Sequence, residues 1–278
     1  MKSPANSCDP RSASVRQPRL GKRGWRSASF ALVALLPLAA FAELSNDSMI
    51  GPGLRSRPAY DGSDSQRTEL VPVIRHFGPN WFVRSTQGVL EGGLRTELAP
   101  GLHAGAQLAY EPGRMASESA FLAAHNAQDI RRGASIGLQM EWDHVFDPVP
   151  VTLLARVRQH LDSDRGAQAD LRLSVGVFRG GPVSAGLFAQ ATWANAKSTG
   201  SFYGITPPQS ASLGLPLFAA GAGWLSSSSG LLWSVDLNPH WLVVGSAEAR
   251  RLRGDAGQSP LAERTSNYAA SAGIAYRF

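Results

Sequence analysis

Large apolar residues alternate with small or polar ones in repeated stretches of about 9 to 13 residues along most of the chain. Because successive side chains of a strand point to opposite faces, this alternation predicts β-strands. In 182–195 one face carries Val183, Leu187, Ala189 and Trp193, and the other carries Ser184, Gly186, Gln190 and Thr192, with Phe188 as the exception. In the last segment Tyr268, Ala270, Ala272, Ile274, Tyr276 and Phe278 share one side, opposite Asn267, Ser271, Gly273 and Arg277.

Eleven further segments are candidate strands. They are 48–57, 67–77, 81–89, 91–98, 101–110, 134–146, 150–161, 167–179, 217–225, 230–238 and 240–251. Short turns rich in Gly, Pro and Asn, such as Gly78-Pro79-Asn80 and Asp147-Pro148, join many of them and indicate tight reversals. The pattern therefore predicts an all-β chain of antiparallel strands.

The expected number of strands follows from the rule that such barrels have an even number. Single-chain bacterial barrels have an even number of strands with both termini on the periplasmic side, so thirteen segments contain one error. Either 81–98 is one long bent strand or one segment near 217–238 does not span, and we expect about twelve strands. The longer connections 111–132, 196–216 and 252–265 would mostly be extracellular loops.

The N-terminal 42 residues have the order of a secretory signal peptide. Basic residues ending at Arg26 precede an apolar run at 27–39, and Ala40-Phe41-Ala42 predicts cleavage before Glu43. A transmembrane anchor is the alternative, but the run is shorter than the roughly 18 to 20 residues that a spanning helix needs and contains Pro37. We expect a signal peptide at 1–42 and a mature domain at 43–278.

The positive net charge of +6 belongs entirely to this leader, where seven basic residues face one acid. The remaining chain holds 20 basic and 20 acidic residues, which argues against a nucleic-acid-binding face. The single cysteine, Cys8, is also in the leader, so the mature chain would have no disulfide and no thiol chemistry.

A membrane barrel fits these features better than a soluble barrel or sandwich. Aromatic residues stand near predicted strand ends, where the interfacial girdles of membrane barrels lie: Trp81, Trp142, Phe146, Trp193, Trp224, Trp233 and Trp241. The chain ends on an amphipathic strand at Phe278, with Tyr276 on the same face. This ending resembles the C-terminal signal that the barrel-assembly machinery reads. We therefore expect a transmembrane β-barrel in the lipid bilayer of the cell outer membrane.

Three predicted loops carry motifs that resemble those of the MipA/OmpV family, in the family's order and over roughly residues 48–278. The first is Tyr60-Asp61-Gly62-Ser63-Asp64. The second is Ser201-Phe202-Tyr203-Gly204-Ile205-Thr206-Pro207, followed by Gln209-Ser210 and Gly214-Leu215-Pro216. The third is Gly254-Asp255-Ala256 with Ser259-Pro260, and the closing Tyr276-Arg277-Phe278 agrees.

The resemblance implies an outer-membrane barrel that is not an enzyme. The family's founding member is regarded as a scaffold that links a murein-degrading transglycosylase to a murein synthase, so murein hydrolases and synthases are the implied partners. Other members are known as antigens or for osmotic and antibiotic-related phenotypes. A channel or adsorptive surface for small solutes is therefore the alternative function.

Charged residues on the inward face of three predicted strands form a candidate site. Hairpins through 134–179 would set Glu141 against Arg156 and Arg158 against Asp170, with Arg172 close by. This lumenal charge ladder could line a selective pore, or it could be a packed interior, because small barrels fill with side chains. The packed interior is the simpler interpretation.

Other chemistry has weak support. Acids in or near probable loops could hold calcium, namely Asp61, Asp64, Asp162, Asp164 and Asp170, but no full ligand loop is visible and solvated acids explain them. A lipid hydrolase would need a Ser-His pair, yet the histidines are scattered and there is no Gly-x-Ser-x-Gly elbow. No phosphate-binding loop or zinc spacing is present, so we expect no cofactor and no catalytic or metal residue.

Overall fold

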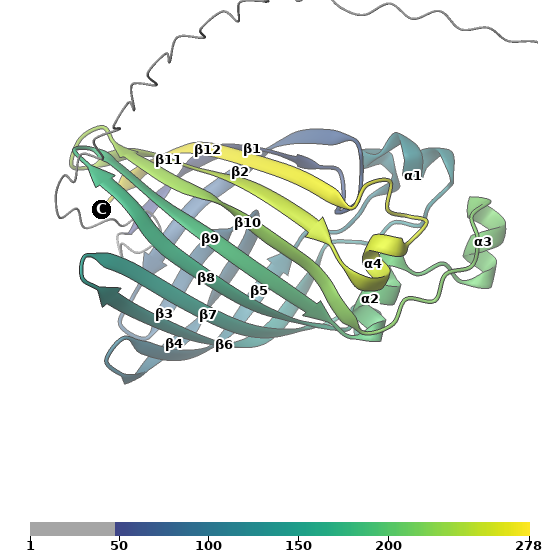
Figure 1. Cartoon of the computed structure of the whole chain (residues 1–278), viewed down its shortest axis with the longest axis horizontal. Helices are drawn as coiled ribbons and strands as arrows, with labels where there is room; N and C mark the ends of the chain where they lie inside the picture. The colour runs from purple at the N-terminus through teal and green to yellow at the C-terminus, as the bar shows by residue number, and fades with distance from the viewer. Residues whose placement is uncertain (1–47) are drawn as a thin grey trace, which may run out of the picture. The chain divides into compact units, whose positions relative to one another are not determined.

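Residues 48–278, which the computed structural model describes, form a closed barrel of twelve antiparallel strands (Figure 1). The strands are β1 (Met49–Pro58), β2 (Gln66–Phe77), β3 (Trp81–Thr86), β4 (Val89–Ala99), β5 (Leu102–Glu111), β6 (Gly133–Phe146), β7 (Val149–His160), β8 (Ala167–Gly180), β9 (Val183–Ala194), β10 (Gly223–Asp236), β11 (Trp241–Leu252) and β12 (Ser266–Arg277). Neighbours in sequence are neighbours in the sheet, and β12 pairs with β1 to close it. The predicted signal peptide and Cys8 lie outside the described residues.

The predicted strand count of about twelve is confirmed, and the parity problem has a definite source. The segments 217–225 and 230–238 are not two strands, because β10 runs without a break from Gly223 to Asp236. Its centre is the serine run Ser226–Ser229, whose small polar side chains interrupt the apolar alternation without interrupting the ladder to β9 and β11. The other alternative, one bent strand over 81–98, is wrong, since β3 and β4 form a hairpin around Gln87 and Gly88.

The two ends of the barrel differ in construction. Short turns join the strands at the end where β1 begins and β12 finishes (Figure 1). The longer connections are at the other end and carry short helices: η1 (Ala116–Glu118), α1 (Ala120–Ala124), η2 (Ser163–Arg165), α2 (Ala196–Tyr203), α3 (Pro207–Leu213) and α4 (Gly254–Gln258). Since both termini of bacterial barrels face the periplasm, the helical end is extracellular.

The side chains are arranged as a bilayer requires, with apolar residues outside and polar residues inside. Leu70, Leu94 and Leu138 are each more than 65% exposed on the outer surface, whereas Gln139, Arg156 and Asp170 are buried in the lumen. Of the predicted girdle residues, Trp81, Phe146, Trp193, Trp224 and Trp241 are exposed, and Trp142 and Trp233 are partly covered. Within residues 48–278, no helix is long and apolar enough to cross a membrane.

Candidate functional site

The register of strands β6 to β8 decides which charges meet in the lumen. Arg156 lies opposite Gln139 and not opposite Glu141, which faces Leu154. Asp170 lies opposite Arg156 and not opposite Arg158. The predicted cross-strand registers were therefore wrong by two residues, because the β6–β7 turn places Phe146 opposite Val149 and the β7–β8 ladder begins with Gln159 opposite Ala167. The predicted contact between Arg158 and Asp170 is nevertheless present as a 2.8 Å ion pair. A shift of two keeps every side chain on its face, so the same residues still point inward.

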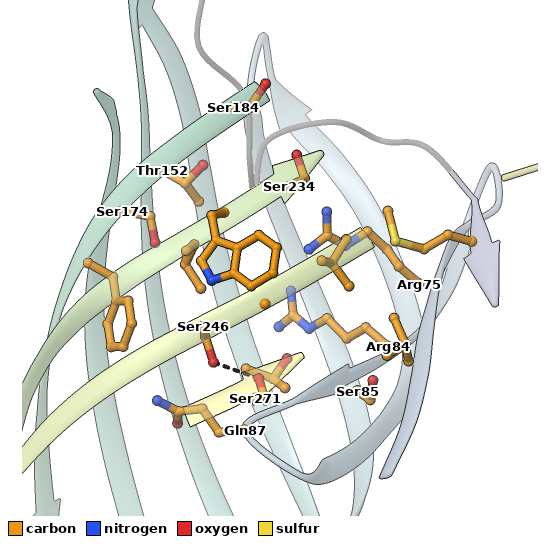
Figure 2. A pocket seen from close by; sticks show the side chains of 18 of the residues that line it. Arg75, Arg84, Ser85, Gln87, Thr152, Ser174, Ser184, Ser234, Ser246 and Ser271 are labelled. Carbon is orange, nitrogen blue, oxygen red and sulfur yellow. Dashed lines mark hydrogen bonds between the residues drawn. The ribbon is translucent and has the colours of Figure 1, made fainter. Parts of the chain in front are cut away.

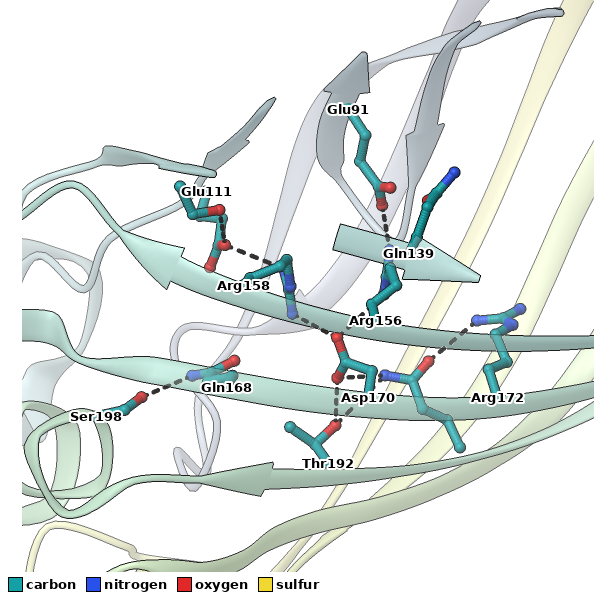
Figure 3. Close-up of polar contacts among 12 residues, drawn as sticks. Glu91, Glu111, Gln139, Arg156, Arg158, Gln168, Asp170, Arg172, Thr192 and Ser198 are labelled. Carbon is teal, nitrogen blue, oxygen red and sulfur yellow. Dashed lines mark hydrogen bonds and ion pairs between the residues drawn. The ribbon is translucent and has the colours of Figure 1, made fainter. Parts of the chain in front are cut away.

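Inward-facing side chains of β3 to β9 form what we call the lumenal charge network. It consists of Arg84, Glu91, Glu111, Gln139, Glu141, Arg156, Arg158, Asp170, Arg172, Gln190 and Thr192. Figure 3 shows the part of it around Arg156, Arg158 and Asp170. Arg156 Nη1 is 2.6 Å from Glu91 Oε1, and its Nη2 is 3.3 Å from Asp170 Oδ2. Arg158 Nη2 is 2.8 Å from the same Asp170 oxygen, and Arg158 Nη1 is 3.0 Å from Glu111 Oε1.

Uncharged partners complete the network. Thr192 Oγ1 donates to Asp170 Oδ1 over 2.8 Å, and Ser135 Oγ donates to Glu111 Oε1 over 2.6 Å. Arg172 Nη1 donates to the side-chain oxygen Oε1 of Gln190 over 3.4 Å, and its guanidinium lies 4.0 Å from the centre of the Phe188 ring. These contacts bridge strands across the interior, which is how buried charges are normally compensated.

Glu141 lies at the edge of the network. Arg84 Nη1 is 2.9 Å from Glu141 Oε2, and Arg84 also donates to Gln139 Oε1 over 3.0 Å. Sequence reasoning missed Arg84, Glu91 and Glu111, although a charged residue within or directly after each of the predicted strands 81–89, 91–98 and 101–110 could have indicated an inward polar face.

A second group of charges occupies the other side of the lumen, on β1, β2 and β11. Glu69 accepts from Arg57 Nε over 2.7 Å and lies 3.9 Å from Arg55 Nη1. The tip of the β3–β4 hairpin turns into the barrel, where Gln87 Nε2 donates to Glu248 Oε2 over 2.9 Å. The interior is thus crossed by side chains from opposite walls.

The first family motif lies in the β1–β2 loop and is held by the β11–β12 connection. Tyr60 Oη donates to the Leu261 carbonyl over 2.9 Å. Gly62 N donates to Asn267 Oδ1 over 2.8 Å, and Asn267 Nδ2 donates back to the Ser63 carbonyl over 2.7 Å. Asp64 bonds the Ser65 hydroxyl on the exposed side of the turn.

The second motif packs on the first. Tyr203 Oη donates to the Asp61 carbonyl over 3.2 Å, and Ser259 Oγ of the third motif donates to the Tyr203 carbonyl over 2.6 Å. Burial raises the pKa of the Tyr203 phenol far above its usual value, so it stays a hydrogen-bond donor. Three loops distant in sequence therefore meet at this tyrosine.

The remaining motif residues shape the same loops. Thr206 caps α3, with Pro207 at its first turn, and Gln209 completes a capping box. Asp255 Oδ2 accepts from Gly221 N over 2.7 Å, which ties the third motif to the start of β10. Ser201, Phe202 and Gly204 belong to α2 and its C-cap, and Pro260 follows Ser259 in the β11–β12 connection.

Together these loops form a structure that we call the lid. Its apolar centre consists of Ala59, Tyr60, Leu122, Ala127, Ile205, Leu213 and Leu261. Asp61 fastens the lid to the lumen because its Oδ2 lies 2.7 Å from Arg250 Nη1. Burial would raise the pKa of the Asp61 carboxyl, but the charge and hydrogen bond of Arg250 outweigh burial and hold it below its usual value.

Between the network and the end where the termini lie, a cavity of about 840 Å³ occupies the lumen (Figure 2). It extends from the level of Glu248 and Phe188 to Pro100 and Gly101 in the β4–β5 turn, at the end where the termini lie. Six arginines and four acids line it: Arg55, Arg75, Arg84, Arg172, Arg179 and Arg277 with Glu141, Asp143, Asp236 and Glu248. Serine hydroxyls lie between them, and Ser246 and Ser271 are hydrogen-bonded at 2.9 Å.

The acids considered as calcium ligands do not gather. Asp61 pairs with Arg250 in the lid, Asp170 pairs with two arginines in the lumen, and Asp162 Oδ1 accepts from Asp164 N in its own turn. Among residues 48–278, no group of three or more His, Cys, Asp or Glu side chains could hold a metal ion.

Comparison with known proteins agrees with this architecture. The model of the family described as MltA-interacting protein MipA matches residues 50–278. The chain belongs to the MipA family. This confirms the resemblance inferred from the loop motifs, and the MipA-family barrel described above is an outer-membrane protein. A search of curated proteins finds no significant match.

Several solved structures are similar in fold at low identity. The NanC porin is 12% identical, with a TM-score of 0.46, over 83% of this chain and 100% of that one. An outer membrane channel from Pseudomonas putida F1 is 11% identical, with a TM-score of 0.47, over 86% and 98%. LpxR from Salmonella typhimurium is 10% identical, with a TM-score of 0.44, over 82% and 99%.

Proposed function

We propose that this MipA-family barrel is a non-conducting, non-enzymatic scaffold that organises murein hydrolases and synthases at the periplasmic face of the outer membrane. The observation that carries the proposal is the asymmetry of the lumen. The lid loops pack together at its extracellular end and the lumenal charge network crosses its interior, while the cavity extends to the end where the termini lie. Such a barrel offers its accessible surfaces to the periplasm.

The identity of the partners follows from the family. Its name describes interaction with MltA, and a murein hydrolase is the partner that the name supports. A murein synthase is the second partner that a linking scaffold needs. Assembly into the bilayer would use the barrel-assembly machinery, with Tyr276 and Phe278 as the recognised ending.

The test is affinity capture from outer-membrane extracts with the folded mature protein, and the retained proteins are identified by mass spectrometry. An unrelated barrel is the control for non-specific binding. Specific recovery of murein hydrolases or synthases is the expected result. Recovery equal to that of the unrelated barrel would reject the scaffold.

Matched variants then locate the binding end. Asp147→Ala and His240→Ala alter exposed residues in turns at the end where the termini lie, and Ser212→Ala alters an exposed residue of the lid. The scaffold predicts weaker capture for one or both turn variants and unchanged capture for the lid variant. Loss of capture only with Ser212→Ala would contradict a periplasmic docking surface.

A further inference from the structure

The barrel wall is weakly closed between β2 and β3, a region that we call the β2–β3 seam. β2 pairs with β1 over ten residues but with β3 only through Arg75, His76 and Phe77. The ladder stops because β3 ends at Thr86 and the hairpin tip at Gln87 turns into the lumen. The upper part of β2 therefore has no strand on its β3 side within the described residues.

The bonds of Ile74 show which backbone groups of β2 face the seam. Ser85 Oγ accepts from Ile74 N over 3.0 Å and donates to Ile74 O over 3.4 Å, so the peptide groups of Ile74 point toward β3. By the alternation of an antiparallel strand, those of Pro72, Leu70 and Thr68 point the same way. Pro72 has no N–H to leave unpaired, which suits an edge position.

The open edge lies at membrane depth. Leu70 is 79% exposed on the outer surface, and its neighbour across the β1–β2 ladder, Leu54, is 55% exposed. Lipid-exposed sheet edges are not tolerated in the hydrocarbon region, and unpaired backbone occurs there only where it lines a polar cavity or is covered. A polar space or a ligand must therefore reach this edge from the lumen.

The lumen cavity meets the seam on both sides. It is lined by Val71 to Ile74 of β2 and by Ser85 to Gly88 of the hairpin. Arg55, Arg75 and Arg84 line it next to these segments, and a side chain added at Gly88 would strike Arg55 Nη1 at 2.2 Å. Figure 2 shows Arg75 and Arg84 pointing into this space beside Ser85 and Gln87.

We propose that the lumen cavity communicates with the bilayer through the β2–β3 seam and binds an anionic phospholipid. The phosphate lies among Arg55, Arg75 and Arg84, where it competes with Glu69 for Arg55 and with Glu91 and Glu141 for Arg84. Arginines outnumber acids by six to four along the lining, and guanidinium groups can form bidentate bonds to a phosphate. The acyl chains leave between β2 and the hairpin over the apolar outer surface. The cavity volume lies in the range of about 300 to 1,000 Å³ usual for small ligands, so it accepts the head group while the chains stay in the membrane.

The experiment blocks the seam without changing the fold. The predicted mature chain has no cysteine, so Thr86→Cys, which lines the cavity at the seam, can be labelled alone with a bulky maleimide. The same label on Ser212→Cys in the lid is the matched control. Binding of phosphatidylglycerol and of phosphatidylcholine to the detergent-solubilised protein is measured by native mass spectrometry before and after labelling.

The expected result is preferential binding of phosphatidylglycerol that falls about tenfold or more on labelling Thr86→Cys and is unchanged on labelling Ser212→Cys. Arg75→Gln should reduce the preference for phosphatidylglycerol over phosphatidylcholine. Equal binding before and after the Thr86→Cys label would overturn the proposal. So would full competition by inorganic phosphate, which would identify a soluble anion entering from the periplasmic end.

The inference goes beyond the proposed scaffold and does not depend on it. Capture of murein enzymes is measured separately, and the labelled Thr86→Cys protein should still retain them. Lipid binding without enzyme capture would reject the scaffold alone, and the opposite result would reject the lipid site alone.

Discussion

Replacing Arg156 by glutamine should destabilise the barrel, because it removes a buried charge that two carboxylates share. The Arg156 side chain is only 4% exposed and forms ion pairs with Glu91 at 2.6 Å and with Asp170 at 3.3 Å. Breaking a buried pair by removing one partner typically costs about 3 to 5 kcal/mol, because the other charge stays buried. Glu91 keeps Arg84 at 3.4 Å and Asp170 keeps Arg158 at 2.8 Å, so we expect the lower end, about 3 kcal/mol.

The assay is urea unfolding of the refolded protein in lipid vesicles, followed by tryptophan fluorescence. The matched control is Asp236→Asn, which breaks the 2.7 Å pair with Arg277 where the two side chains are 40% and 26% exposed. Exposed pairs contribute about 0 to 1 kcal/mol, so this variant should unfold near the wild type.

A double variant tests the pairing itself. Glu91→Gln combined with Arg156→Gln should lose less free energy of unfolding than the sum of the single changes, by about 0.5 to 3 kcal/mol. If Arg156→Gln costs no more than Asp236→Asn, or if the two changes simply add, then water in the lumen screens these charges. The description of a packed, charge-filled interior would then be incorrect.

Three further predictions concern the ends of the barrel. In planar bilayers the wild-type protein should give no steady ion current, since the lid loops pack together at the extracellular end and the network crosses the lumen; stable conductance would support the channel alternative. Because the folded pKa of Asp61 is depressed, its contribution to lid stability is present above the unfolded pKa of about 3.9 and is lost as pH falls through the folded value. Protection of the loop amides against hydrogen exchange, relative to the intrinsic rate at each pH, should therefore fall in acid, and Asp61→Asn should remove this fall; an unaltered loss of protection in that variant would contradict it. Phe278→Ala should lower the amount of folded protein recovered in outer membranes, measured by heat-modifiable migration, and full recovery would reject its role in assembly.

The alternation of side chains was sufficient to predict the barrel and its two faces, because its period of two is insensitive to small errors of register. The hairpin register was wrong by two residues, yet Arg156, Arg158 and Asp170 were still placed in the lumen. The strand prediction failed in β10, because its serine run lacks the apolar residues whose alternation indicates a strand. Only the hydrogen-bonded pairing with β9 and β11 shows that β10 is continuous.

The contacts between loops could not be predicted from the sequence. The motif residues could be recognised in the sequence. The hydrogen bonds from the Tyr203 hydroxyl to the Asp61 carbonyl and from the Ser259 hydroxyl to the Tyr203 carbonyl could not, because they depend on how three loops fold at one end of the barrel. The inward turn of the β3–β4 hairpin was equally hidden. Gln87 has a positive φ of 51° and reaches Glu248 across the lumen, a contact 161 residues apart that no local pattern indicates.

The lid and the seam together determine how the interior can exchange with its surroundings. The lid joins the loops after β1, β9 and β11, so it ties strands on both sides of the β1–β12 closure and covers the extracellular end. On the periplasmic side of the lid, the lumenal charge network links β4 to β8, because Arg156 of β7 bonds both Glu91 and Asp170. Under the two proposals, solutes enter the cavity from the periplasmic end and lipids enter it through the β2–β3 seam. The cavity would then be a compartment shared by the periplasm and the bilayer, where a scaffold of murein enzymes could sense the membrane that holds it.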